Sequence, residues 1–112
     1  MSDRRAIEVL TECAELMRQK GKAYNNIPQA EYYPNGQHDL FCMMWQKIKR
    51  IQSLLNTPNA DNQFEGLNDS VRDLINYSSF FIEYSEGKMD GMSKAQLNEL
   101  GLRDEDDEFG LR

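Results

Sequence analysis

Apolar side chains recur at helical spacing in three long stretches of the chain, and nowhere do they alternate as they would in a strand. The stretches cover about residues 4–20, 39–55 and 64–84. Each is long enough for about five turns of helix. The pattern therefore predicts an all-α fold with three main helices.

Capping and helix-breaking residues set the expected ends of these helices. Ser2 or Asp3 is placed to cap the first helix and Gly21 to end it, and Asp39 is placed to cap the second. Residues 21–38 contain prolines, asparagines and tyrosines and are predicted to form an ordered loop with some aromatic anchoring.

A short fourth helix is predicted near the C-terminus. Ser93 and Gln96 have the spacing of a capping box, so this helix should run through about residue 100. Beyond it the chain is acidic and lacks an apolar pattern, and we expect it to be disordered. The sequence divides into a helical domain, 1–86, and a segment with the short helix and acidic tail, 87–112.

The second and third helices carry more apolar surface than one narrow stripe. The Trp45 and methionine stripe of the second helix is predicted to be core. On the third helix, Tyr77, Phe80 and Tyr84 widen the apolar surface, as a second subunit packed there would require. We therefore expect the helical bundle to be completed by a homodimer or a higher homo-oligomer.

Composition excludes several classes of protein. The 112 residues suit one small domain, and the two cysteines and one histidine do not have the spacing of a zinc site or a disulfide framework. No apolar run is long enough to span a bilayer or to act as a signal segment, so a cytoplasmic location without a membrane partner is expected. The net charge of −6 argues against nucleic acid recognised through a basic surface.

The most informative stretch is an acidic face on the third helix. Glu65, Asp69, Asp73 and Asn76 fall within a sector of roughly 80°. Clustered oxygen ligands are what Mg²⁺ prefers, and Mg²⁺ neutralises polyphosphates. The alternative is a solvated face of an amphipathic helix, which helix periodicity alone favours.

Basic residues on the second helix complement that face. Lys47 and Arg50 would either contact phosphate oxygens or pair with acidic residues of a neighbouring helix. In the first case a metal would activate water and polarise a phosphoryl group. This chemistry needs no nucleophilic side chain, and the sequence has no Ser/His or Cys/His arrangement.

Three motifs together resemble a known family. They are Lys20-Gly-Lys-Ala-Tyr24-Asn-Asn26, Lys47-Ile-Lys-Arg50-Ile, and Glu65-x-x-x-Asp69-x-x-x-Asp73-x-x-Asn76-Tyr77. In order and spacing they resemble the phage and bacterial nucleotide-modification-associated domain. That domain is similar to the all-α nucleoside triphosphate pyrophosphohydrolases, the MazG and dimeric dUTPase group.

The resemblance implies a helical, usually oligomeric protein that binds a nucleotide and Mg²⁺, or Mn²⁺ in its place. It implies hydrolysis of a ribo- or deoxyribonucleoside triphosphate to monophosphate and pyrophosphate in phage nucleotide metabolism, in the host cytoplasm. Carried onto this chain, it gives catalytic roles to Asp73 and Glu65. The metal ligands are then Glu12, Glu15, Glu65, Asp69 and Asp73. The substrate-binding residues are Lys20, Tyr24, Lys47, Arg50 and Asn76.

Two functions without catalysis stay open beside this one. A small acidic helical protein with the run Asp104-Glu-Asp-Asp-Glu108 could be a phage protein that binds or inhibits a host protein. The same scaffold could also bind a nucleotide without turning it over. Deletion of the tail separates the first alternative from an enzyme.

Overall fold

The computed structural model describes residues 4–23, 26–57 and 63–102, and in the helix that starts at Gln63 it describes side chains from Gly66 onward. These residues form helices and no strand, which confirms the predicted all-α class. The elements are α1 (Arg5–Ala23), the 3₁₀ helix η1 (Gln29–Tyr32), α2 (Gln37–Leu55), α3 (Gln63–Ser85) and α4 (Lys94–Glu99).

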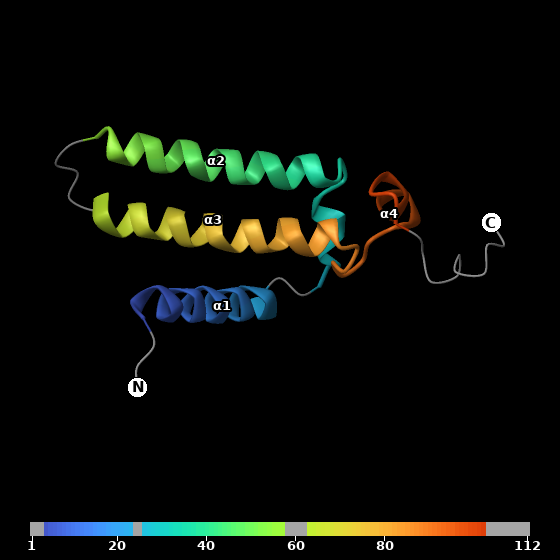
Figure 1. Ribbon diagram of the computed structural model, residues 1–112, viewed down its shortest axis with the longest axis horizontal. Coiled ribbons are helices and arrows are strands. Elements are labelled where there is room, and N and C mark those ends of the chain that lie inside the picture. Colours follow the sequence, from blue (N-terminus) through green and yellow to red (C-terminus); the bar gives the residue numbers. More distant parts are fainter. Residues whose placement is uncertain (1–3, 24–25, 58–62, 103–112) are drawn as a thin grey trace.

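The three long helices lie side by side, with α3 in the middle (Figure 1). α1 and α2 flank it, and α2 runs antiparallel to α3. The α2–α3 contact is the more extensive of the two, and α1 packs on α3 over a smaller area. A row of helices buries only the sides on which neighbours touch, so this arrangement leaves two broad faces.

Two predicted helix ends were wrong. α1 continues through Gly21 to Ala23, because a glycine inside a helix costs only about 1 kcal/mol and does not break the hydrogen-bond ladder. α2 starts at Gln37, with Gly36 as its N-cap at φ 73°. Asp39 instead sits in the first turn and accepts hydrogen bonds from the backbone N–H of Asn35 at 2.8 Å and its side-chain Nδ2 at 3.2 Å.

The short fourth helix and its capping box are confirmed. Ser93 accepts a hydrogen bond from the backbone of Gln96, and the Gln96 side chain accepts one from the backbone of Ser93. The amide nitrogen of Gln96 also donates to the carbonyl oxygens of Ala30 at 3.1 Å and Tyr33 at 3.2 Å. One side chain thus caps α4 and holds it against η1.

The main core lies at one end of the layer, where η1, the start of α2, the end of α3 and the residues after α3 meet. Its buried members come from sequence positions far apart: Ala30, Tyr33, Leu40, Tyr84 and Met89. The segment beyond residue 87 therefore completes the core of the helices before it. Tyr84, which we expected to face a second subunit, is fully buried within its own chain.

The Trp45 and methionine stripe of α2, which was predicted to be core, is only partly buried, because its methionines are half-buried and other members are exposed. Leu40 is fully buried, but Phe41, Trp45, Ile48 and Leu55 are between 42% and 62% exposed. The prediction was wrong for these four residues, which lie about 100° around α2 from the buried Leu40. Of the tail, residues 103–112 lie outside the described part of the chain.

Replacement of Gly91 by alanine should strongly destabilise the fold. Gly91 has φ +80°, and a Cβ atom there would overlap Pro28, which leads into η1. We expect Gly91→Ala to lower the free energy of unfolding by the ~1–2 kcal/mol cost of a left-handed residue plus about 1–3 kcal/mol for the overlap. Urea denaturation followed by circular dichroism measures this.

Gly101→Ala is the matched control. Gly101 has nearly the same φ, +74°, but nothing lies within 4 Å of the position its Cβ would take. It should show only the conformational cost. Equal destabilisation by the two variants would contradict the close approach between Gly91 and Pro28.

Candidate functional site

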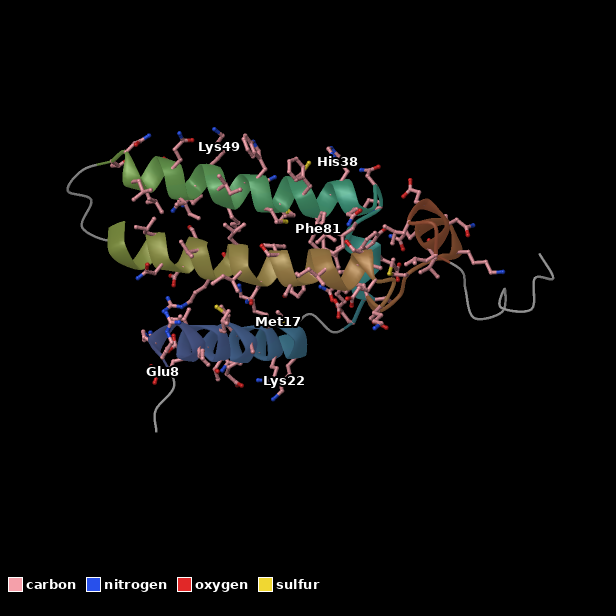
Figure 2. All side chains as sticks on the ribbon, viewed as in Figure 1. Glu8, Met17, Lys22, His38, Lys49 and Phe81 are labelled. Atoms are coloured by element: carbon pink, nitrogen blue, oxygen red, sulfur yellow. The ribbon has the colours of Figure 1, made fainter. Side chains whose placement is uncertain are left out.

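A cavity of about 690 Å³ opens on one face of the helical layer. Its walls come from the end of α1, the middle and end of α3, η1, and Lys47 of α2. Met17 of α1 points toward α3 beside it (Figure 2). Pockets of this size hold ligands as large as a cofactor or a nucleotide.

One end of the cavity is lined by three charged groups from three helices. Asp73 of α3 lies 3.1 Å from Nζ of Lys47 on α2 and 3.5 Å from Nζ of Lys20 on α1. The side chains of Asp73 and Lys47 are 25% and 29% exposed, and that of Lys20 is 56% exposed. Two cations therefore share one carboxylate, which leaves an excess positive charge at this end of the cavity.

Asn76 lines the same cavity and fixes the position of α1. It is buried, and its side-chain nitrogen donates to the backbone carbonyl of Cys13 at 3.2 Å. Cys13 is itself 1% exposed. A buried amide without a hydrogen-bond partner destabilises the fold. The hydrogen bond between Asn76 and Cys13 therefore fixes the position of α1 along the axis of α3.

The other end of the cavity is aromatic and acidic. Tyr77 and Phe80 of α3 meet edge to face, with ring centroids 5.8 Å apart, and Tyr33 is buried beside them. Burial raises the pKa of Tyr33. Burial, and next the nearby carboxylate of Asp90, raise the pKa of Glu83, which lines this end too.

The cavity can therefore accommodate a ligand with two different ends. Lysine ammonium groups attract anionic oxygens, whereas aromatic rings favour a flat or apolar group. The oxygens of the Glu83 carboxyl group can accept hydrogen bonds from a ligand at this end. Four predicted site residues, Lys20, Lys47, Asp73 and Asn76, are brought together here.

The predicted acidic residues of α1 lie outside the cavity. Glu12 pairs with Arg5 at 2.6 Å and with Arg72 at 3.3 Å, and its hydrogen bond with Arg5 lowers its pKa. Arg72 also reaches Asp69 at 3.7 Å. Glu15 pairs with Arg18 at 3.5 Å, one turn along α1.

Three further predicted residues do not contribute to the described walls. Arg50 is exposed on α2 and does not line the cavity. Tyr24 lies outside the described residues, as does the side chain of Glu65 in the first turn of α3.

The fit of a metal ion can be tested on the described carboxylates. Glu12, Asp69 and Asp73 each face a basic side chain. Within residues 4–102, apart from the parts left undescribed, no three His, Cys, Asp or Glu side chains form a group that could hold a metal ion. No metal-dependent step is assigned to these residues. The predicted Mg²⁺ site stays a prediction.

Sequence reasoning missed Arg72, Tyr33 and Glu83. Arg72 follows Asp69 at i, i+3, a spacing that predicts a pair on one helix but not its bridge to α1. The tyrosines of residues 21–38 predict aromatic anchoring of the loop, but not which of them reaches the cavity. Glu83 stands about two turns beyond Asn76 on the same side of α3, and this spacing is the signal that could have extended the site toward the core.

No protein-family model, curated protein or solved structure matches this chain. The resemblance to the nucleotide-modification-associated domain therefore stays a prediction that rests on the three motifs. Among the described helices, none combines the length and the apolar character needed to cross a membrane.

The raised pKa of Glu83 predicts a pH-dependent contribution to stability. Between the ordinary glutamate pKa of 4.5 and the raised pKa, the folded protein binds more protons at this carboxyl than the unfolded chain does. The contribution of Glu83 to stability is therefore fully present below pH 4.5 and is lost as pH rises through the raised pKa. Glu83→Gln removes this loss. Urea denaturation at pH 4 and pH 7 should show the variant gaining stability relative to the native protein as pH rises.

Glu86→Gln is the control, because Glu86 is exposed just after α3. This variant should retain the pH dependence of the native protein. An unchanged difference between native protein and Glu83→Gln at the two pH values would show that Glu83 is not the responsible group.

Proposed function

We propose that this protein binds a nucleotide in the cavity between α1, α3 and η1. The observation that carries the proposal is the convergence of Lys20 and Lys47, from two different helices, on one carboxylate beside an aromatic wall. Phosphate and base are the anionic and the flat parts of one ligand, and the two ends of the cavity suit them in turn.

The phosphates take the lysine end of the cavity. In the free protein Asp73 holds both ammonium groups in place, so the cations are already oriented when the ligand arrives. Preorganised groups lose little freedom on binding, and this favours affinity. Lys47 contributes most, because it is the less exposed of the two and is closer to Asp73.

The base takes the aromatic end. Tyr77 and Phe80 offer ring edges and faces for stacking. The carboxyl group of Glu83 lies at the same end and is suited to the ring N–H or amino groups of a base, as carboxyl groups accept from such donors. In this orientation the phosphates of the ligand lie near Lys47 of α2 and Asp73 of α3.

Hydrolysis to a monophosphate and pyrophosphate is a separate proposal, and it rests on the resemblance. It requires a metal, and the predicted ligand Glu65 has its side chain outside the described residues. A phage origin, a cytoplasmic location and a host-protein partner likewise stay predictions. The predicted homo-oligomer is independent of the cavity, since a different surface supports it.

Substitution of Lys47 should weaken nucleotide binding. We expect Lys47→Met to raise the dissociation constant for a deoxynucleoside triphosphate about tenfold or more, the usual value of a charge-assisted hydrogen bond. Isothermal titration calorimetry at low and high salt measures it, and the salt dependence should shrink with the charge.

Lys49→Met is the matched control for Lys47→Met. Lys49 is two residues away on α2 but points out from the layer, over the ring of Trp45 at 4.8 Å (Figure 2). Its dissociation constant should stay within about twofold of the native value. Equal effects at the two lysines would show that only the net charge of α2 matters and would remove the support for the cavity.

Asp73→Asn distinguishes binding from metal-dependent turnover. With a chelator present, Asp73→Asn should tighten nucleotide binding about fivefold, since a negative charge that repels phosphate from about 4 Å away in water is worth roughly 1 kcal/mol. The asparagine side chain keeps an oxygen that can accept from both lysines, so most of their orientation is retained. With Mg²⁺ or Mn²⁺ added, pyrophosphate release is measured over a panel of ribo- and deoxyribonucleoside triphosphates.

The outcomes of the Asp73→Asn experiment separate the functions. Turnover by the native protein that Asp73→Asn abolishes would establish a metal-dependent pyrophosphohydrolase. Tighter binding without turnover by either protein would establish a nucleotide-binding protein. No binding by the native protein to any member of the panel would overturn the proposed function.

A further inference from the structure

α2 carries an apolar stripe that no other element of the described chain covers. Phe41, Trp45, Ile48 and Leu55 fall within a sector of about 80° on the helix, and each is 42% to 62% exposed. Gln52 is the polar residue in that sector. Spacings of four, three and seven residues are those of a helix seam that packs against another helix.

α3 carries a second exposed stripe. Val71 and Ile82 are 37% and 59% exposed, and Ile75 lies between them in the same sector of about 60°. Ser78 is the polar residue of this stripe. Neither stripe contains a charged residue.

The two stripes lie on the same face of the layer. Phe41 directly follows Leu40, which is buried at the core end of α2, and Ile82 directly follows Phe81, which points into the α2–α3 contact (Figure 2). Consecutive residues of a helix are rotated by about 100° around its axis, so each stripe lies about 100° around its helix from the side that contacts the other helix. Since α2 and α3 are antiparallel and face each other, these two rotations lead to the same side.

The nucleotide cavity opens on the opposite side. On α3, Asp73 and Phe80 lie about 160–200° around the helix from the stripe of Val71 and Ile82. We call the seven residues on the side away from the cavity the apolar face; they are Phe41, Trp45, Ile48, Leu55, Val71, Ile75 and Ile82.

We infer that the apolar face packs against the same face of a second copy of this chain. A helical domain normally has two layers around its core, and one chain supplies a single row of long helices. A second copy supplies the missing layer. The resulting pair of α2–α3 hairpins resembles a four-helix bundle, with the two cavities on its outer sides.

The size and composition of the face fit this partner. Six members of the face are more than a third exposed, and a fully exposed side chain of this size offers roughly 150–250 Å². Together the six contribute an accessible area on the order of 500 Å². Each partner in a standard interface buries ~800 Å², so the face supplies a large share of that area. None of the seven side chains is charged, and the Nζ of Lys49 lies over the ring of Trp45 at the edge of the face, so the face suits an apolar partner better than a strongly charged one. It also matches itself, as a two-fold interface requires.

Two measurements on the full chain test the inference. Sedimentation velocity gives the mass, and the fluorescence of Trp45, the one tryptophan of the sequence, reports whether the face is covered. We expect twice the monomer mass of 13.1 kDa, a blue-shifted emission and protection from iodide. Dilution below the dissociation constant should shift the emission to the red as the mass falls.

Ile48→Glu should raise the dimer dissociation constant at least about 100-fold, because each copy would bury an unpaired carboxylate. Leu10→Glu is the matched control, since Leu10 is 54% exposed but lies on α1, away from the apolar face. Its mass should equal that of the native protein. Circular dichroism tells whether each variant remains helical.

The combined results decide the inference even if Ile48→Glu unfolds. A native dimer with protected Trp45 supports it, and so does unfolding of Ile48→Glu from such a dimer. A native monomer with protected Trp45 would mean that the chain covers its own face, and a monomer with accessible Trp45 would leave the face to another protein. A dimer with accessible Trp45 would use a different surface. Each of these three outcomes overturns the inference.

Discussion

A row of helices one layer deep can bury only the sides on which the helices touch, and most features of this protein depend on that constraint. α3 has neighbours on two sides, so its sequence serves α1, α2 and two open faces at once. One open face is hollowed into a charged and aromatic cavity. The other remains apolar and exposed. The main core forms at one end of the row, where η1 and the residues after α3 pack against α2 and α3.

Electrostatics and hydrogen bonding hold α1 where apolar packing is thin. Asp73 bridges Lys20 of α1 and Lys47 of α2, and Asn76, less than one turn away, binds the backbone at Cys13. Partly exposed ion pairs each contribute little to stability. Their value here is positional, because they fix the spacing of three helices around the cavity that we propose binds a nucleotide.

The sequence was sufficient to predict the helices but not the sides they bury. Helical spacing located three long helices, and capping chemistry located α4, because both depend on neighbouring residues. Exposure of Phe41 and Trp45 depends on how many helices surround α2, which no local pattern records. The motifs left open whether Lys47 contacts phosphate or pairs with an acidic residue of a neighbouring helix, and in the free protein it pairs with Asp73 of α3. The motifs could not show that Arg72 forms ion pairs with Glu12 and Asp69, since the pair with Glu12 depends on the position of α1 along the axis of α3.

The double role of Gln96 has a consequence for the boundaries of this fold. Its amide holds the carbonyls of Ala30 and Tyr33, and Ala30 also donates to the backbone of Asp90 at 2.9 Å. Tyr33 and Asp90 are both part of the cavity wall. A version of the chain shortened after α3 would keep the lysines and lose the support of the opposite wall. The smallest unit able to keep the cavity intact thus extends through α4.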